Sequence, residues 1–577
     1  MFSVVPSAAG PPKSEKRRLE PRAADGIPER GKRPSSRRFS HITCARLWIR
    51  VQIDAALLNP LGYLQAVAWR MRGLRVRSRN RIASLAGRSP FAYRFWIACR
   101  EAQIQSRLRD PSPHLVPKIL PVIDCTSGNG DVNATLASLP NDIRPVVVGG
   151  PSILGANGIA TIADLGSELK QDEVWICPIQ AGDRLAEGAF SIYGEAIAHA
   201  PQSRLFYGDD DLLTGQCERT EPHFKPDWNP ELFKHHDFLT GTSVIKCSRA
   251  DLQDIQGQNW ANVLVHRSLE RCPEPQHVRH VLHHRHSRPA PIVPLKPTNL
   301  HLGPHPSVTV IIPTRNRADL LRTCIDGLVR ANYPDQHVII IDNESDEPET
   351  IAMLEGLRGQ GCSVVSVAGP FNFSALNNVA AKQARGEFLC FLNNDVEMID
   401  LDWLALLVRQ AARPGIGAVG ARLLYPDRTV QHAGVFTGIG GGAAHAHRFQ
   451  REEDPGYFYR AHLPQRVSAV TAACLVVSRE KFLSAGGFDE ENFPVAFNDV
   501  DLCLKLNQMG WQSFYEPRAT LIHHESKSRG SDTSSEKRAR FARELAALKQ
   551  KWRTHELKDP YHHPNLSPFS EQFVIAI

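Results

Sequence analysis

A run of five apolar residues, Phe388–Leu392, is the feature that most restricts the fold of this chain. A strand that is apolar at every position has to be buried on both faces, as in a parallel sheet that helices cover. The run ends at Asn393, Asn394 and Asp395. Because ligands of open α/β sheets lie beyond the carboxyl ends of strands, Asp395 is a candidate ligand for Mg²⁺ or Mn²⁺ on a diphosphate. The same residues also form ordinary turns, and this stretch alone leaves both interpretations open.

The segments before this run alternate between strand and helix patterns. Predicted strands lie at 308–312, 337–341 and 362–367, and predicted helices at 319–330, 349–358 and 375–384. Ser374 is the expected N-cap of the last helix. This spacing is typical of βαβ units, so the sequence predicts an α/β fold with a mainly parallel sheet.

Polar residues follow the first two predicted strands, at 313–317 and 342–346. An acidic residue at the end of the second strand, here Asp342, can bind a ribose hydroxyl or a base edge. The chain has no G-x-G-x-x-G or Walker loop, which disfavours dinucleotide binding and P-loop hydrolysis.

Two further polar signals lie downstream. Asp499 falls in the first turn of a predicted helix, where the helix dipole favours a carboxylate and where simple capping is an equally good interpretation. A strand pattern then ends at His523 and His524, whose imidazoles can bind metal.

Length and composition indicate an ordinary globular protein. The 577 residues suffice for two or three domains, and the apolar content of 42% and charged content of 22% are typical values. No apolar run approaches the roughly 18 residues of a membrane span. The twelve cysteines include no Cys-x-x-Cys pair, so neither a zinc knuckle nor a disulfide framework is indicated, and we expect a cytoplasmic protein.

The net charge of +7 comes mainly from the N-terminus, since residues 1–40 hold ten Lys or Arg and four Asp or Glu. We expect residues 1–44 to be a disordered basic tail. Residues 45–113 mix apolar residues with arginines, which predicts basic amphipathic helices. Such helices could lie on a membrane surface or pack on the next domain, and no nucleic-acid partner is expected.

The remaining segments predict a first α/β unit at 114–290, a linker at 291–306, a second unit at 307–530, and a C-terminal helix and tail at 531–577. Asp209–Asp211 could bind metal, but an exposed acidic turn is the preferred interpretation. Phe541, Leu545, Leu548 and Trp552 recur at helical spacing, which indicates core packing against the second unit.

Seven short motifs of the second unit, taken in order, resemble those of family 2 glycosyltransferases with the GT-A fold. They are V310-I-I-P-T-R-N316, I341-D-N-E-S345, F371-N-F-S-A-L-N377, L392-N-N-D395, G486-G-F-D489, N498-D-V-D501 and H523-H-E-S526. The resemblance is to bacterial enzymes that build O-antigen, capsule and related glycans, often rhamnosyltransferases. Three motifs of the first unit, G182-D-R-L185, Y207-G-D-D-D211 and E221-P-H-F-K-P-D-W228, resemble the GT-A module that precedes the catalytic one in tandem family members. Acidic residues are missing at its other strand ends, so the resemblance implies two tandem modules of which the first is degenerate.

The resemblance also implies roles for individual residues. Asp499 matches the catalytic base, Asp395 the metal ligand, and His524 (or the adjacent His523) a further candidate ligand, with Mg²⁺ or Mn²⁺ as cofactor. Asn393 stands where the family has an aspartate. The donor-binding positions are Pro313, Thr314, Asn316, Asp342, Ser345, Asn377, Asn393 and Asn394.

These roles predict an inverting glycosyltransferase that moves a sugar from a nucleoside-diphosphate donor to a hydroxyl of a glycan or lipid-linked acceptor. We expect a protein on the cytoplasmic side, with contact to the inner membrane face as one option. A non-catalytic nucleotide-sugar-binding or scaffold protein is the alternative, and a nucleotidyltransferase is disfavoured because no glycine- and lysine-rich phosphate loop follows the first strand.

Overall fold

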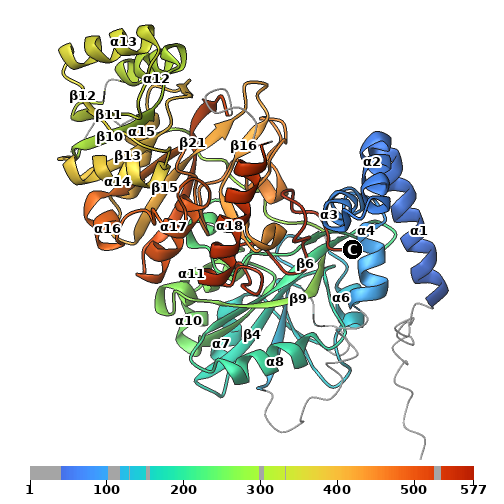
Figure 1. Cartoon of the computed structure of the whole chain (residues 1–577). Coiled ribbons are helices and arrows are strands. Elements are labelled where there is room, and N and C mark those ends of the chain that lie inside the picture. Colours follow the sequence, from blue (N-terminus) through green and yellow to red (C-terminus); the bar gives the residue numbers. More distant parts are fainter. Residues whose placement is uncertain are drawn as a thin grey trace, which may run out of the picture. The chain divides into compact units, whose positions relative to one another are not determined.

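Two mixed sheets with helices on their faces make up most of the structure (Figure 1). The computed structural model describes residues 41–577 except 102–116, 129, 151, 153–155, 298–304, 332 and 526–533. The first forty residues of the expected basic tail lie outside this range.

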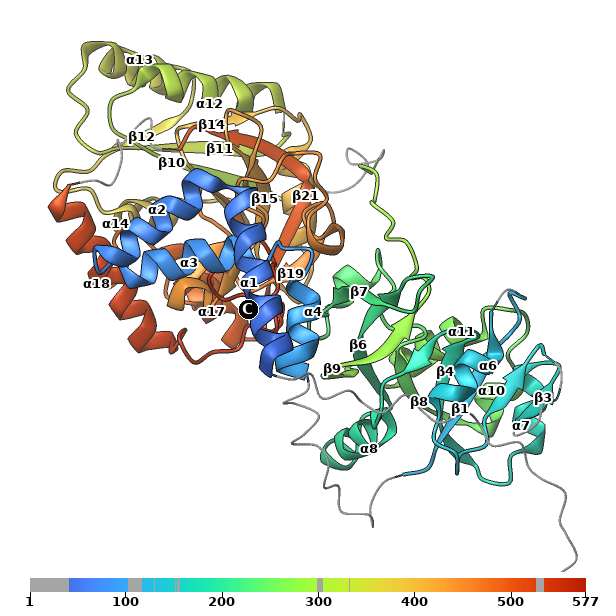
Figure 2. The same ribbon diagram turned by 90° about the vertical axis from the view of Figure 1, so that its right-hand side faces the viewer.

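The described residues before the first sheet, 41–101, are mostly helical (Figure 2). The helices are α1 (His41–Leu58), α2 (Pro60–Met71), α3 (Arg75–Ala86) and α4 (Ala92–Trp96), followed by a π-helical turn (Ile97–Glu101). Helix α2 begins where the Asn59 side chain accepts the Gly62 N–H and where Pro60 lacks an N–H to satisfy. A small core that includes Val51, Ala55 and Leu85 joins α1 to α3.

The first sheet lies within the predicted unit at 114–290. Its elements are β1 (Ile119–Asp124), α6 (Val132–Ser138), β2 (Val146–Val148), β3 (Asn157–Ile159), α7 (Ile162–Glu168), β4 (Glu173–Gln180), β5 (Arg184–Leu185), α8 (Ala189–His199), β6 (Leu205–Leu213), β7 (Arg219–His223), α9 (Pro230–Phe233), β8 (Ser243–Ser248), α10 (Arg249–Gln253), α11 (Trp260–Arg271) and β9 (Gln276–Arg285). The strands are ordered β3-β2-β1-β4-β8-β6-β9-β5, with β7 paired to β6.

The second sheet follows the same plan. Its elements are β10 (Val308–Thr314), α12 (Ala318–Ala331), β11 (Gln336–Asp342), α13 (Pro348–Gly359), β12 (Ser363–Ser366), α14 (Phe373–Gln383), β13 (Phe388–Leu392), β14 (Val396–Met398), α15 (Trp403–Ala411), β15 (Ile416–Leu424), β16 (Val430–His432), β19 (Gln465–Val467), β20 (Cys474–Ser478), α16 (Arg479–Ser484), α17 (Asn498–Gln508) and β21 (Gln512–His523). The strands are ordered β12-β11-β10-β13-β20-β15-β21-β14. A separate hairpin joins β17 (Val435–Thr437) to β18 (Ala443–His445).

The two sheets match strand by strand in order and in direction. In each, the first four strands are parallel, the fifth and sixth run antiparallel to their predecessors, and the seventh is parallel to the sixth. This agreement confirms two tandem modules. Each sheet is parallel through its first four strands and mixed beyond them. The sequence could not show this change, because an apolar run such as Cys474–Val477 reports burial on two faces and says nothing of strand direction.

Strand β13 is buried on both faces by two separate layers of helices. Phe388, Cys390 and Leu392 pack with α12 and α15, whereas Leu389 and Phe391 pack with α14 and α17. This alternation is the two-residue period of a strand. Five consecutive apolar residues therefore serve two cores, and they hold Asn393–Asp395 at the edge where the strand ends.

Helix α14 begins one residue earlier than the predicted cap. Asn372, not Ser374, is the N-cap, and its side chain accepts the Ala375 N–H at 2.9 Å. Ser374 lies inside the helix and donates its hydroxyl to the Phe493 carbonyl. Both residue types cap helices well, so the local sequence could not distinguish them.

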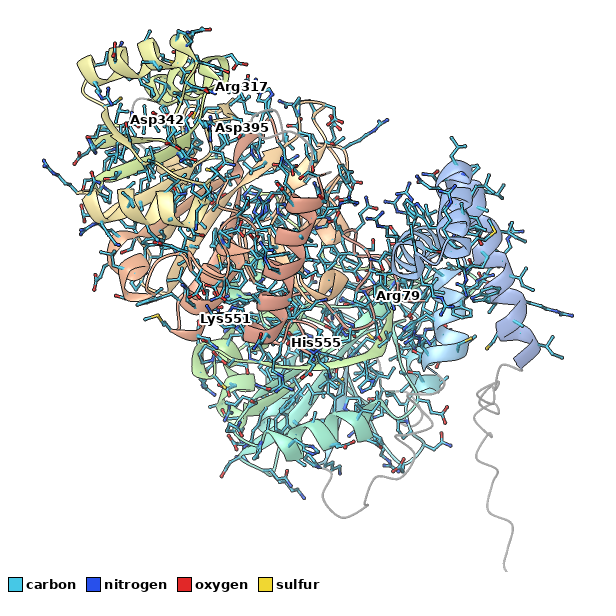
Figure 3. All side chains as sticks on the ribbon, in the orientation of Figure 1. Arg79, Arg317, Asp342, Asp395, Lys551 and His555 are labelled. Carbon is cyan, nitrogen blue, oxygen red and sulfur yellow. The ribbon has the colours of Figure 1, made fainter. Side chains whose placement is uncertain are left out.

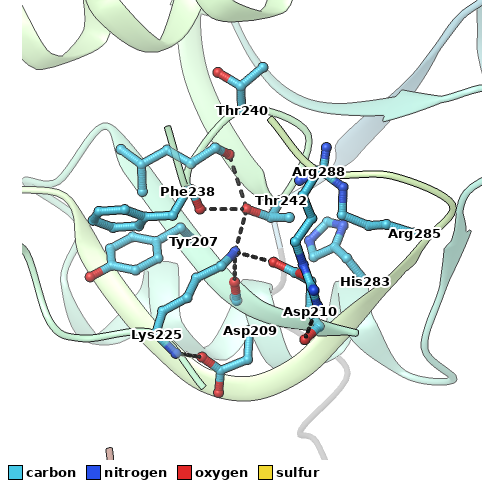
Figure 4. A network of polar contacts seen from close by, with 12 residues as sticks. Tyr207, Asp209, Asp210, Lys225, Phe238, Thr240, Thr242, His283, Arg285 and Arg288 are labelled. Carbon is cyan, nitrogen blue, oxygen red and sulfur yellow. Dashed lines mark hydrogen bonds and ion pairs between the residues drawn. The ribbon is translucent and has the colours of Figure 1, made fainter. Parts of the chain in front are cut away.

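Asp209–Asp211 do not form an exposed turn, and that prediction is wrong. All three lie in β6 and are at most 1% exposed. The Lys225 ammonium lies 2.9 Å from the Asp210 carboxylate and also donates to the Thr242 hydroxyl and the Gly208 carbonyl (Figure 4). Buried carboxylates persist because charged partners compensate them, and these partners come from distant parts of the chain.

Segments within the second module and after it contact the first module. His563 Nε2 lies 3.1 Å from an Asp209 oxygen, and the Asp227 N–H donates to the Pro560 carbonyl at 2.7 Å. The Phe224 N–H donates to the Tyr457 hydroxyl at 2.9 Å. The first module is therefore held by contacts to segments that follow it far along the chain.

Candidate active site

A cavity of about 780 Å³ opens at the carboxyl ends of β10 and β13. This volume suits a ligand the size of a nucleotide sugar. Seven of the predicted site residues line it: Pro313, Thr314, Asn316, Asn393, Asn394, Asp395 and Asp499. Asp342, Ser345, Asn377 and His524 are not among the lining residues. Figure 3 shows Arg317, Asp342 and Asp395 in the same part of the second module.

Asp342 and Ser345 lie outside the cavity and hold the loop that follows β10, which lines it. The Asp342 carboxylate accepts the Ser345 N–H at 3.0 Å, and the Ser345 hydroxyl accepts the Asn316 N–H at 2.8 Å. On the next strand, the Asn394 amide donates to the Thr314 hydroxyl at 2.9 Å. These bonds fix the positions of Thr314 and Asn316, which do line the cavity.

Asn377 is misplaced by the prediction. It is fully buried inside α14, and its side-chain amide donates to the Phe373 carbonyl one turn earlier. Because the helix begins at Phe373, position 377 faces the protein interior rather than the cavity. Within the described part of the chain, the Asn377 side chain makes its hydrogen bond to its own helix and not to another predicted donor-binding residue.

Asp395, Asn393 and His523 form the corner of the cavity that suits a cation. Asp395 Oδ1 lies 3.1 Å from His523 Nε2, and the Asn393 amide nitrogen lies 3.3 Å from the same ring atom. Asp395 is 4% exposed, and Asn393 Oδ1 is buried without a hydrogen-bond partner in the described part of the chain. Carboxylate, amide oxygen and imidazole are donors that Mn²⁺ and Mg²⁺ accept.

His523, not His524, belongs to this corner. His524 Nε2 lies 2.9 Å from the Glu397 carboxylate, and His524 is absent from the cavity lining. Successive side chains of a strand point to opposite faces, so only one of the two histidines can face Asp395. The preference for His524 is therefore corrected to His523.

The tautomer of His523 is set by Gln431. The Gln431 amide nitrogen donates to Glu525 at 2.9 Å, so its oxygen is the atom 2.7 Å from His523 Nδ1. That oxygen can only accept, which places the ring proton on Nδ1 in the neutral imidazole. Nε2 then presents a lone pair to the Asp395 carboxylate. Two electron donors 3.1 Å apart fit a site for a cation.

Asp499 enters the cavity from the first turn of α17. Its Oδ2 accepts the Ala472 N–H at 3.0 Å, and its Oδ1 accepts the Val500 N–H at 2.8 Å. Each carboxylate oxygen has two lone pairs, so these bonds orient the group and leave it able to accept a proton. The neighbouring Asp501 is fully buried, lies 2.7 Å from the Lys551 ammonium and is not among the cavity residues, so its carboxylate holds an ion pair away from the cavity.

His445 lines the cavity near Asp499. Burial lowers the pKa of His445, the Arg448 guanidinium lowers it further, and the Asp499 charge opposes both effects. The net pKa is below the usual histidine value, so the ring is neutral at pH 7.

Helix α18 (Ser535–Trp552) supplies cavity residues that the sequence did not reveal. Lys537, Arg540 and Phe541 line the cavity, and Phe541 is 44% exposed with its ring 5.3 Å from that of Phe497. Core packing was predicted for Phe541, and this is wrong, whereas Leu548 is fully buried as expected. The helical period identifies an apolar face, but it cannot say whether that face meets a core or a cavity.

Arg317 and Arg448 also line the cavity and were not predicted. The Arg317 guanidinium is paired with Asp319, and Arg448 donates to the Tyr425 hydroxyl at 2.7 Å. Scattered arginines carry no sequence signal of their own, so only the folded structure brings these charges to one place.

A second cluster, Asp209, His277 and His563 of the first module and tail, has three groups close enough to hold a metal. The contacts there favour charge pairing instead. His277 lies 3.0 Å from Asp209 and 3.0 Å from Asp227, one carboxylate on each ring nitrogen. His563 Nδ1 accepts the Asn565 N–H, which leaves the ring proton on the nitrogen that faces Asp209.

In the described part of the first module, contacts join the loops that follow the corresponding strands. Asp183 precedes β5 as Asp395 precedes β14, and its carboxylate accepts the His286 N–H at 2.8 Å. The Gln180 amide reaches across to the Asp124 carbonyl and Ser127. A Cβ at Gly130 would come 1.9 Å from the Ala181 carbonyl oxygen. The two loops that frame the cavity in the second module are thus in direct contact here.

None of the helices in the described part of the chain is both long enough and apolar enough to span a membrane.

Comparison with known proteins identifies the second module. Residues 309–482 match the family model "Glycosyl transferase family 2". The chain is 36% identical over 449 residues to the uncharacterized protein y4gI of Sinorhizobium fredii, covering 70% of this chain and 49% of that protein. It is 35% identical over 438 residues to the O-antigen biosynthesis protein RfbC of Myxococcus xanthus, covering 67% of this chain and 33% of that protein. The chain thus spans half or less of the length of these two relatives.

Among solved structures, a mannosyltransferase of Pyrobaculum calidifontis in complex with GDP-Man and Mn²⁺ superposes with a TM-score of 0.33. The sequence identity is 21%, and the match covers 45% of this chain and 68% of that chain. The family match at residues 309–482 coincides with the module that carries the cavity. The chain therefore contains a glycosyltransferase domain of family 2.

Proposed function

We propose that the second module transfers a sugar from a nucleoside-diphosphate donor to a hydroxyl group, with inversion at the anomeric carbon. The observation that carries this proposal is the meeting of Asp395 and Asp499 in one cavity, from two elements far apart in sequence. One carboxylate stands beside cation-binding partners and the other stands apart at a helix N-terminus. This arrangement provides a place for the diphosphate and a base for the acceptor.

Each step then has a residue of this chain to perform it. Thr314 and Asn316, held by Asn394 and Ser345, bind the nucleotide. Asp499 accepts the acceptor's proton as its oxygen attacks the anomeric carbon, which turns a weak nucleophile into an effective one. A single displacement by the acceptor oxygen inverts the sugar carbon.

The leaving diphosphate gathers negative charge, and the cavity offers cationic groups to meet it. Arg317, Arg448, Lys537 and Arg540 line the cavity. Asp395, Asn393 and His523 would hold Mg²⁺ or Mn²⁺, which when bound offsets charge on the diphosphate.

We further propose that the acceptor is a growing surface glycan or a lipid-linked glycan, as in O-antigen, capsule or exopolysaccharide synthesis. The similarity to an O-antigen biosynthesis protein supports this class of product. Lipid-linked acceptors lie at the inner membrane face, so we place the protein in the cytoplasm with peripheral contact to that membrane.

The test combines a donor panel with one substitution. UDP-, GDP- and dTDP-sugars are screened for binding by calorimetry, and transfer is then measured with the donor that binds. Asp499→Asn should keep donor affinity, because the amide has the same shape, and should lose about 10²–10⁴-fold in transfer rate.

The matched control is Asp489→Asn, a carboxylate outside the cavity lining that pairs with Lys551. Normal transfer by a folded Asp499→Asn would remove the proposed base. Tight donor binding with no transfer by the wild-type protein, across a panel of glycan acceptors, would instead indicate a nucleotide-sugar-binding protein.

A further inference from the structure

We propose that helices α1, α2 and α3 form a docking surface for an anionic lipid bilayer. The surface consists of the exposed apolar residues of α1 and α2 together with the exposed arginines of α2 and α3. The inference rests on the proposed function in one respect: a lipid-linked acceptor lies in a bilayer, so an enzyme that uses it would have to reach the membrane. The binding itself requires no sugar transfer.

The apolar part of this surface follows one side of α1. Ile42, Ile49, Ile53 and Leu57 recur at intervals of seven, four and four residues, which places them on one face of the helix. Their side chains are 65%, 53%, 46% and 71% exposed. The opposite side of α1 supplies Val51 and Ala55 to the small core with α3, so the helix is already packed on its other face.

Helix α2 extends the apolar surface. Leu61, Leu64 and Met71 recur near helical spacing and are 82%, 64% and 79% exposed. Exposed apolar residues in such number are uncommon on a monomeric protein and mark an interaction site.

The charges around these residues are almost all positive. Residues 41–100 contain eleven arginines, no lysine, and one acidic residue, Asp54, a net charge of 11 − 1 = +10. Asp54 is 9% exposed, accepts the Ser89 hydroxyl at 2.6 Å and lies 3.4 Å from Arg50. Exposed arginines lie in α2, in the turn after it and in α3, at positions 70, 72, 75, 77, 79 and 81.

This combination fits anionic lipid better than the other candidate partners. Aliphatic side chains enter the acyl boundary of a bilayer while arginines bind its headgroups, which is the pattern of interfacial amphipathic helices. A nucleic acid would leave the leucines and isoleucines exposed. A second copy of this chain would bring two clusters of like charge together.

The test is co-sedimentation of the full-length protein with vesicles of phosphatidylcholine alone and of phosphatidylcholine mixed with phosphatidylglycerol. We expect binding to the mixed vesicles, weak binding to the neutral ones, and release as salt is raised, because the arginines act through a screened field. The triple variant Arg72→Gln, Arg75→Gln, Arg77→Gln should weaken binding to the mixed vesicles by at least tenfold, since each arginine near the surface is worth about fivefold.

The double variant Leu61→Gln, Leu64→Gln removes apolar contact without touching charge and should also weaken binding. Its matched control is Leu295→Gln, Leu401→Gln, which changes residues that are 89% and 60% exposed outside these helices. Circular dichroism checks the fold of each variant. Donor binding is measured on the same samples, so a failed membrane test is separate from a failed glycosyltransferase.

Equal binding to neutral and anionic vesicles, or no effect of either variant, would overturn the proposal. So would a concentration-dependent dimer in light scattering that Leu61→Gln, Leu64→Gln abolishes, because that outcome assigns the apolar face to a second copy of the chain.

Discussion

At the scale of single residues, His523 and His524 show how two adjacent side chains take unrelated roles. One faces Asp395 and the other faces Glu397. His523 Nδ1 donates to the Gln431 side-chain oxygen at 2.7 Å, which orients the ring with Nε2 toward Asp395. Two successive histidines at the end of β21 thus face two different carboxylates, and only one of these, Asp395, lines the cavity.

This difference predicts unequal effects on metal binding. His523→Ala should weaken Mn²⁺ affinity at least tenfold, and Gln431→Ala should weaken it by about tenfold because the ring loses its orientation. His524→Ala is the control and should leave the affinity near normal. Electron paramagnetic resonance of free Mn²⁺ in the presence of the nucleoside diphosphate measures this directly.

Asp395→Ala and EDTA complete that experiment. Both should reduce donor binding if the cation bridges Asp395 and the diphosphate. Equal donor affinity in the wild type, in the wild type with EDTA and in Asp395→Ala would mean that donor binding is independent of metal. A larger loss of Mn²⁺ affinity for His524→Ala than for His523→Ala would assign the metal ligand to His524 instead.

Many of the candidate residues could be predicted at this scale because they follow strands in a short local pattern. Asn393–Asp395 and Thr314 are adjacent to apolar runs, so the sequence places them at one sheet edge. Asn377 could not be placed, since its direction depends on where α14 begins. Arg448 and Gln431 come from segments without a motif, and only tertiary packing brings them to the cavity.

At the scale of elements, the C-terminal tail is held by aromatic and histidine contacts that depend on pH. The Phe573 ring lies 4.7 Å from the His447 ring and 5.3 Å from the His562 ring. Burial, together with the Arg460 charge, lowers the pKa of His447 and that of His562 to about 3 each. Both rings are therefore neutral in the folded protein at any pH above about 3.

We predict that acid weakens the folded state from about pH 6.5 downward through these two histidines. Both folded pKa values are depressed, so the stabilisation is present above pH 6.5 and is lost as the pH falls, because the unfolded chain takes up protons that the folded one cannot. Between pH 6.5 and 5 the loss amounts to about 2 kcal/mol for each histidine.

Urea unfolding at pH 7 and pH 5 measures this loss. The variant His447→Gln, His562→Gln should have a smaller difference between the two midpoints than the wild type. His555→Gln is the matched control, since its side chain is 51% exposed, and it should keep the wild-type difference. An unchanged difference in the double variant would place the acid sensitivity elsewhere.

At the scale of the whole molecule, the two modules share one strand order but differ at one sheet edge. In the second module this edge opens into the cavity, whereas contacts cross it in the described part of the first module. Gln180 and Gly130 close that edge in the first module. Burial raises the pKa of Asp183, although Arg285 and His286 oppose the effect. The corresponding Asp395 instead lines the cavity.

We predict that the first module transfers no sugar. Asp183→Asn in the full-length protein should leave transfer within about twofold of the wild type, whereas Asp395→Asn should reduce it strongly. Product linkages are determined by nuclear magnetic resonance for both variants. Loss of one of two linkages in a folded Asp183→Asn protein would identify the first module as a second active site. Replacement of Asp209–Asp211 is a poor test, because it would leave Lys225 buried without its partner.

The repeat was visible in the sequence as two successive α/β patterns, but its closed edge was not. Strand periodicity reports burial, and both modules bury their strands alike. The compensated carboxylates of β6 illustrate the limit, because Lys225 and Arg288, which neutralise Asp210, belong to other segments. A charge run in one segment cannot reveal its partners in another.

The contact of His563 with Asp209 also bears on the order in which the protein folds. The ribosome completes β6 and β9 long before it adds the tail that covers them. Until then the Asp209–His277 pair has water on the side that His563 later occupies. The first module should therefore mature only after the second has been synthesised, and such long-range closure is slow. During synthesis this half of the protein is the one that most depends on protection from premature association.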